Sequence, residues 1–131
     1  MIAFDTNVLV RLLARDEPTQ ARRARRTVES ADASGGPILI NDIVLAETLW
    51  TMGRTFKASR AELLDMAQAL YEVPTLAFES RDTVARAIGL FTMSSADFSD
   101  CLIVAKNDAA GCRETLTFDL DCSRLPSARA L

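Results

Sequence analysis

Hydrophobic residues follow two different periods along this chain. Short apolar runs, typical of buried strands, alternate with longer stretches in which apolar residues recur every three or four positions, as in helices. Strands are predicted at 2–4, 37–40, 74–78 and 115–118, with a last short one near 127–131. Helices are predicted at 7–14, 17–31, 42–53, 59–71, 80–91 and 97–110.

The alternation of strands and helices predicts an α/β fold with a parallel sheet and helices on both of its faces. Functional sites in such sheets form beyond the carboxyl ends of the strands. Asp5 and Asp119 each stand at the carboxyl end of a predicted strand. We therefore expect both acids at the same edge of the sheet. With 131 residues, of which 49% are hydrophobic, the chain is expected to form a single domain over residues 1–131.

The composition of the chain excludes several kinds of catalytic and metal site. The chain has no histidine, which excludes Ser-His-Asp triads, histidine zinc sites and histidine-based RNA cleavage. Its three cysteines form no C-x-x-C pair, so neither a disulfide framework nor a zinc knuckle is expected. No apolar run reaches the roughly 20 residues of a membrane span, and the N-terminus lacks the features of a secretory signal, so we expect a cytoplasmic protein. Because the net charge is −3, nucleic acid would have to bind at a local basic patch.

Carboxylates remain as the candidate chemistry. Glu47 lies four residues after Ile43 and three before Trp50, so it is expected to share a core-facing helical stripe with them. Asp97 and Asp100 are one turn apart on another helix, where two negative charges at about 4 Å repel by roughly 4 kcal/mol at an effective dielectric near 20. A divalent cation would turn that repulsion into attraction. Oxygen ligands without His or Cys suit Mg²⁺ or Mn²⁺.

Each acid also has a purely structural explanation. Asp5 or Asp97 can cap a helix, Asp119 can serve in a turn, and Glu47 can pair with an arginine. These explanations account for the acids one at a time. They do not account for two strand-end acids together with acids on two helices.

Four segments carry a resemblance to a known family. They are FDTNVL at 4–9, NDIVLAE at 41–47, ADFSDCLIVA at 96–105 and TFD at 117–119. In this order they resemble the motifs of PIN domains, and specifically those of VapC-type toxin ribonucleases. Val104 and Asp121 depart from the family pattern, which often has a smaller and a basic residue there.

The resemblance implies a three-layer α/β/α domain with a central parallel sheet of about five strands. It also implies Mg²⁺- or Mn²⁺-dependent RNA cleavage, a homodimer and a VapB-like antitoxin as partner. The implied catalytic residues are Asp5, Glu47, Asp100 and Asp119, of which Asp5, Asp100 and Asp119 would hold the metal. The neutral donors Thr6, Asn7 and Thr117 would support them, with Asp97 adding negative charge.

Binding surfaces are predicted less specifically. Arg11, Arg15 and Arg22 could contact RNA phosphates, or could belong to a solvated helix face. Trp50 and Phe56 could form a groove for an antitoxin helix, or could pack in the core.

Two other functions stay open. One is a Mg²⁺-dependent, phosphatase-like phosphoryl-transfer enzyme with Asp5 as nucleophile. That chemistry usually uses a D-x-D pair and a nearby lysine, but Asn7 occupies the second position and the only lysines are Lys57 and Lys106. The other is a non-catalytic, nucleic-acid-binding PIN module, against which the presence of all four acids argues.

Overall fold

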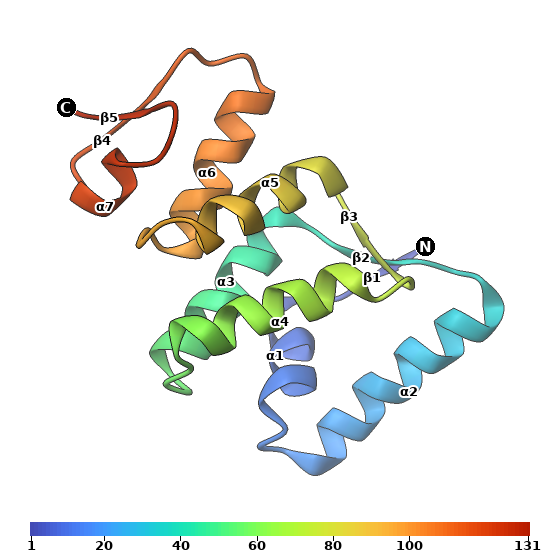
Figure 1. Cartoon of the computed structure of the whole chain (residues 1–131). Helices are drawn as coiled ribbons and strands as arrows, with labels where there is room; N and C mark the ends of the chain where they lie inside the picture. The colour runs from blue at the N-terminus through green and yellow to red at the C-terminus, as the bar shows by residue number, and fades with distance from the viewer. The chain divides into compact units, whose positions relative to one another are not determined.

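A computed structural model describes the whole chain, residues 1–131. The chain divides into two compact units, Met1–Glu79 and Ser80–Leu131, which together contain seven helices and five strands (Figure 1). The elements occur in the predicted order, and the mixed α/β class is confirmed. Whether the chain acts as one domain stays a prediction.

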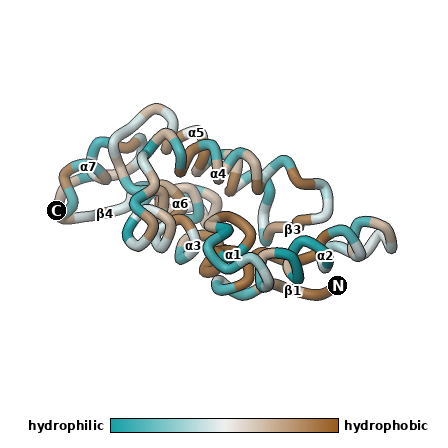
Figure 2. Tube along the Cα trace, turned by 90° about the horizontal axis from the view of Figure 1, so that it is seen from below, coloured by the Kyte–Doolittle hydropathy of each residue, from teal (hydrophilic) through white to brown (hydrophobic).

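The first unit is built on a parallel three-stranded sheet. Its strands are β1 (Ile2–Ala3), β2 (Ile38–Ile40) and β3 (Leu76–Phe78), paired in the order β1-β2-β3. The helices α1 (Thr6–Ala14) and α2 (Pro18–Ser34) connect β1 to β2, and α3 (Asp42–Arg54) and α4 (Arg60–Glu72) connect β2 to β3. Each strand therefore runs directly into a segment that begins a helix. In Figure 2, β1 is brown whereas much of α2 is teal, as expected for a surface helix.

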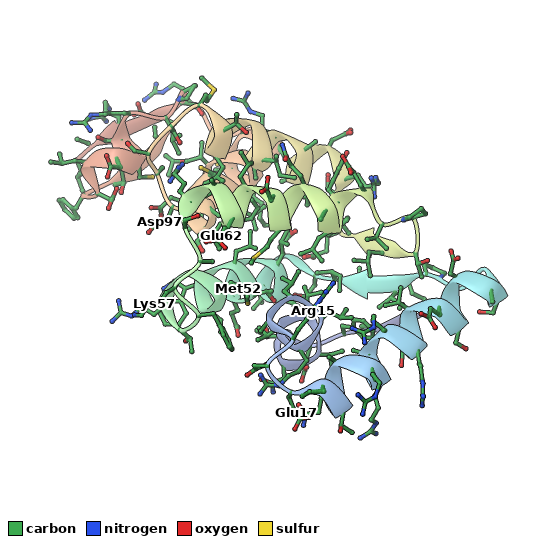
Figure 3. The ribbon with its side chains drawn as sticks, turned by 60° about the horizontal axis from the view of Figure 1, so that its bottom comes forward. Arg15, Glu17, Met52, Lys57, Glu62 and Asp97 are labelled. Atoms are coloured by element: carbon green, nitrogen blue, oxygen red, sulfur yellow. The ribbon has the colours of Figure 1, made fainter.

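Polar side chains define where the helices of this unit begin. The Asn41 side chain accepts a hydrogen bond from the Val44 N–H at 2.9 Å and caps α3. A capping box begins α4: the Ser59 hydroxyl accepts from the Glu62 N–H at 3.1 Å, and the Glu62 carboxylate accepts from the Ser59 N–H at 2.9 Å. Figure 3 shows Glu62 at this helix start.

The packing of α3 differs from the prediction. Ile43 and Trp50 are 69% and 59% exposed, and Glu47 is exposed with them. The buried face of α3 consists instead of Asp42, Val44, Leu45, Thr48, Leu49 and Met52. Apolar residues occupy two faces of this helix, and the face that packs is the one with more of them. The interpretation of Glu47 as part of a core-facing stripe is therefore wrong.

The second unit consists of a helix pair followed by a short strand pair. The helices α5 (Arg81–Thr92) and α6 (Phe98–Ala109) pack together, with the rings of Phe91 and Phe98 edge to face at 5.7 Å. The strands β4 (Thr115–Thr117) and β5 (Ala128–Ala130) are parallel and are connected through the four-residue helix α7 (Leu120–Ser123).

Strand pairing differs from the expected single sheet of about five strands. The five strands pair as a sheet of three and a sheet of two. Apolar runs predict where strands occur but not which strands pair, and each strand here has only two or three residues. The helix α7 was also not predicted, because four residues are too few to show a helical period. No helix is long and apolar enough to cross a membrane.

Replacement of the capping serine, Ser59→Ala, should destabilise the chain by about 1 kcal/mol, because the Glu62 N–H loses its acceptor. Chemical denaturation would measure this loss. The matched control is Ser30→Ala, which changes an exposed serine inside α2 and should alter the unfolding free energy by less than about 0.5 kcal/mol. Equal effects of the two substitutions would show that the bond to the Ser59 hydroxyl contributes nothing.

Candidate active site

Asp5 lies at the turn from β1 into α1. It is the N-cap of α1, with extended backbone angles, and its Oδ1 accepts a hydrogen bond from the Val8 N–H at 3.2 Å. Its Oδ2 makes no hydrogen bond, and the residue is exposed. Asp5 can therefore cap the helix with one oxygen and present the other to a ligand.

Glu47 is joined to the Asp5 segment through Thr6. The Thr6 hydroxyl donates a hydrogen bond to Glu47 Oε2 at 3.2 Å, across 41 residues of sequence. This bond connects the first residue of α1 to the middle of α3, and it holds the Glu47 carboxylate beside the residue that follows Asp5. Asn7, the third residue of this segment, contributes to the wall of a cavity that Asp5 also lines.

Asp100, in the first turn of α6, is the acid of the second unit whose pKa is raised. Partial burial raises the pKa of the Asp100 carboxyl above its ordinary value, and the nearby negative charges of Asp119 and Asp97 raise this pKa further. The second unit therefore brings these three predicted acids into one crowded group.

Asp97 occupies the N-cap position of α6 without capping it. Its backbone is extended and its carbonyl accepts from the Cys101 N–H at 3.0 Å, but its side chain makes no capping bond. The structural explanation of Asp97 as a side-chain cap is therefore wrong. Its carboxylate is exposed and acts on Asp100 through its charge.

Asp119 repeats the arrangement of Asp5. It follows β4, it is the N-cap of α7, and its Oδ1 accepts from the Cys122 N–H at 2.7 Å. Thr117 supports it, since the Thr117 hydroxyl accepts from the Asp119 N–H at 3.0 Å. Oδ2 of Asp119 again makes no hydrogen bond.

Cys122 is a neighbour of these acids that the sequence interpretation missed. Burial raises the pKa of the Cys122 thiol, and the charges of Asp100 and Asp119 raise it further. The thiol is therefore protonated and unsuited to act as a nucleophile near neutral pH. The spacing Asp119-x-x-Cys122, from N-cap to the third helical residue, was the signal available in the sequence.

Glu79 is another strand-end acid that the sequence interpretation did not include. It follows β3, and its Oε2 accepts from the Asp42 N–H at 2.6 Å, at the first residue of α3. One of its oxygens is thus committed to a helix N-terminus, where a carboxylate is favourable. We assign it a structural part.

The carboxylate oxygens of each unit are donors of the kind that hard divalent cations prefer. Within either unit, no three carboxylates or cysteines are placed to hold one metal ion. The first unit has a strand-end aspartate with a free oxygen, Asp5, and a helical acid, Glu47. The second unit separately has Asp119 and Asp100 in the corresponding roles. Oxygen-only donors in a negatively charged setting fit Mg²⁺-like ions.

The predicted RNA-contacting arginines differ in their surroundings. Arg11 lines a cavity beside Asp5, with its guanidinium bound to Gln20 and Asp16. Arg15 is the left-handed C-cap of α1 at the α1–α2 connection (Figure 3), and Arg22 is exposed on α2 outside that cavity. From α2 the cavity is lined by Arg23, which the sequence interpretation did not select.

Trp50 and Phe56 differ in exposure. Trp50 is exposed and the Arg54 guanidinium lies 5.9 Å from its ring centre, whereas Phe56 is half-buried. The expectation that Trp50 packs in the core is therefore wrong. Trp50 and Arg54 thus form an exposed aromatic and cationic surface near the end of α3.

Comparison with known proteins identifies one family. A family model described as the PIN domain matches residues 2–127 of the chain. No curated protein matches the chain.

Asp100→Asn should raise stability at neutral pH in metal-free buffer, with a melting temperature unchanged or a few degrees higher. Because the folded-state pKa of Asp100 lies above its ordinary value of 3.8, stability falls as pH rises through the window between the two values, and the full penalty persists above it. The amide removes this penalty. The gain should shrink as pH falls into that window, where the wild-type carboxyl takes up a proton.

Melting curves from neutral pH down to about pH 4 would measure this gain and its loss. Asp65→Asn, an exposed position on α4, is the control and should leave the melting temperature unchanged. A clear loss of stability in Asp100→Asn at neutral pH would contradict the crowding of charges described above.

Proposed function

Because the chain belongs to the PIN domain family, whose members are generally metal-dependent nucleases, we propose that it is a divalent-metal-dependent endoribonuclease. The observation that carries this proposal is that Asp5 and Asp119 each hold one carboxylate oxygen in a helix cap and leave the other oxygen without a hydrogen bond, available to a cation. Residues that match the family motifs supply all the acids involved. RNA as substrate rests on the resemblance to VapC-type toxins.

The acids have separable parts in this proposal. Asp5, Asp100 and Asp119 would hold Mg²⁺ or Mn²⁺, which supplies a bound water of lowered pKa and stabilises charge on the phosphate. Thr6 keeps one oxygen of Glu47 occupied, so the other oxygen can orient the attacking water and accept its proton. The Cys122 N–H fixes the rotamer of Asp119 in the same way that the Val8 N–H fixes Asp5.

The proposal extends to partners. A toxin of this kind would act as a homodimer and would be silenced by a VapB-like antitoxin. The exposed Trp50 with the half-buried Phe56 offers an anchor for an amphipathic antitoxin helix, because large exposed aromatics are typical of binding hot spots.

The phosphatase-like alternative receives no support from the lysines. Lys57 is exposed at the α3–α4 connection and extends away from it in Figure 3. Lys106 lies near the end of α6. Neither lines the cavity beside Asp5, where a phosphate-binding lysine would be needed next to an aspartate nucleophile.

RNA cleavage should require a divalent metal. Purified protein should cut single-stranded RNA in Mg²⁺ or Mn²⁺ and lose this activity, by about 100-fold or more, in excess chelator. Gel analysis of a labelled RNA would measure it, and metal added back should restore it. Cleavage that persists undiminished in chelator would overturn the metal-dependent mechanism.

Asp5→Asn and Asp100→Asn should each reduce cleavage by roughly 100-fold or more, because each removes a charged metal ligand. Asparagine caps a helix as well as aspartate, so Asp5→Asn should keep α1 intact. Single-turnover cleavage rates, with circular dichroism as a check on folding, would test both variants. Asp97→Asn is the comparison and should cost roughly tenfold or less, since Asp97 acts only through its charge. A dispensable Asp100 beside an essential Asp97 would reverse their assignment.

A further inference from the structure

A cavity of about 410 Å³ opens between α1 and α2 beside Asp5. From its lining we infer that it binds one unstacked nucleotide of single-stranded RNA next to the cleavage site, with Arg23 contacting the phosphate. The volume lies in the range of about 300–1,000 Å³ that is usual for small-ligand sites. All lining residues belong to the first unit. The inference deepens the proposed nuclease function and rests on it.

The walls of the cavity provide for both parts of a nucleobase. Phe4, Val8 and Ala24 supply an apolar surface for the face of the ring. Asn7 and Gln20 supply amides, which carry both donors and acceptors for a base edge. Gln20 uses its oxygen for Arg11 Nε at 2.8 Å, so its NH₂ group remains available.

The two arginines of the cavity are not equivalent. Arg11 donates to Gln20 and forms an ion pair with Asp16 at 3.1 Å, which neutralises its charge. The Arg23 guanidinium makes no hydrogen bond or ion pair. Its backbone carbonyl accepts from the Thr27 hydroxyl at 3.0 Å, which leaves the side chain free. Arg23 is therefore the cation of this cavity that is free to pair with a phosphate, for which its planar group is suited.

The position of Asp5 relates the cavity to the chemistry. Asp5 forms part of the cavity wall and is also a proposed metal-holding acid. A nucleotide in the cavity would therefore belong to the same strand as the phosphate being cut. Bases in a duplex are stacked and paired and cannot enter such a cavity, so the site selects single-stranded RNA.

Binding without cleavage tests the inference. The probe is a fluorescein-labelled, mixed-sequence, single-stranded RNA of about ten nucleotides, titrated in excess EDTA and followed by anisotropy. Arg23→Gln should weaken binding roughly five- to tenfold and lower the salt dependence by about one phosphate contact. The matched control is Arg25→Gln, an exposed position of the same helix that does not line the cavity, and its affinity should stay within about twofold.

A second variant tests whether RNA needs the volume of the cavity rather than the charge of Arg23. Thr27→Phe adds bulk at the half-buried cavity wall without changing charge, and its melting temperature would verify the fold. It should weaken binding of the single-stranded RNA and leave binding of the matching RNA duplex unchanged. Titration of the wild type with adenosine or uridine monophosphate should show tighter binding than titration with inorganic phosphate.

The outcomes separate the two proposals. Equal losses in Arg23→Gln and Arg25→Gln would reduce the effect to general electrostatic attraction and overturn the cavity, while metal-dependent cleavage would still support the nuclease. The same conclusion follows if Thr27→Phe folds and binds single-stranded RNA normally. A wild-type protein that neither binds RNA nor cleaves it in Mg²⁺ would overturn the proposed function and this inference with it.

Discussion

A carboxylate at the junction of a strand and a helix can act in two ways, because its two oxygens accept independently. Asp5 and Asp119 use Oδ1 for the N–H of the third helical residue, and neither uses Oδ2 in a hydrogen bond. The cap removes rotamer freedom from the side chain, so the second oxygen is held ready before any ligand arrives. Capping and ligand binding are thus compatible explanations of these aspartates, and the rest of the proposed site depends on this arrangement.

Hydrogen bonding also distinguishes the acids that stabilise the fold from the acids that destabilise it. Glu79 supports the start of α3, and Glu62 completes the capping box of α4, where two hydrogen bonds to Ser59 lower its pKa. Asp100 has no such compensation, since burial and its acidic neighbours disfavour its ionised form. Asp97 could have capped α6 but its side chain does not. A carboxylate that destabilises the fold and makes no compensating hydrogen bond is a candidate for a functional site.

Local rules predicted much of this structure and long-range rules predicted less. The helices predicted at 42–53 and 59–71 are observed at Asp42–Arg54 and Arg60–Glu72, where Asn41 and Ser59 cap them through local hydrogen bonds. The orientation of α3 was wrong, because Ile43 and Trp50 form an apolar stripe that competes with Val44, Leu45 and Leu49, and only packing against other elements decides between them. Strand pairing is likewise a long-range property. The acids of the candidate site were identifiable from their motifs, but the Thr6–Glu47 bond and the position of Cys122 depend on tertiary structure.

The arginines of α2 differ in the structure although they look alike in the sequence. The sequence shows a run of arginines in an otherwise acidic chain with a net charge of −3, and nothing in the run distinguishes one arginine from the next. The structure distinguishes them by position, since Arg22 lies outside the cavity and Arg23 lines it without a partner. The other arginine of the cavity, Arg11 of α1, is paired with Asp16. An acidic protein that binds a polyanion needs its cations where the polyanion must approach, since long-range attraction is absent. The free guanidinium of Arg23 places such a cation in the cavity that Asp5 also lines, while the chain as a whole stays acidic.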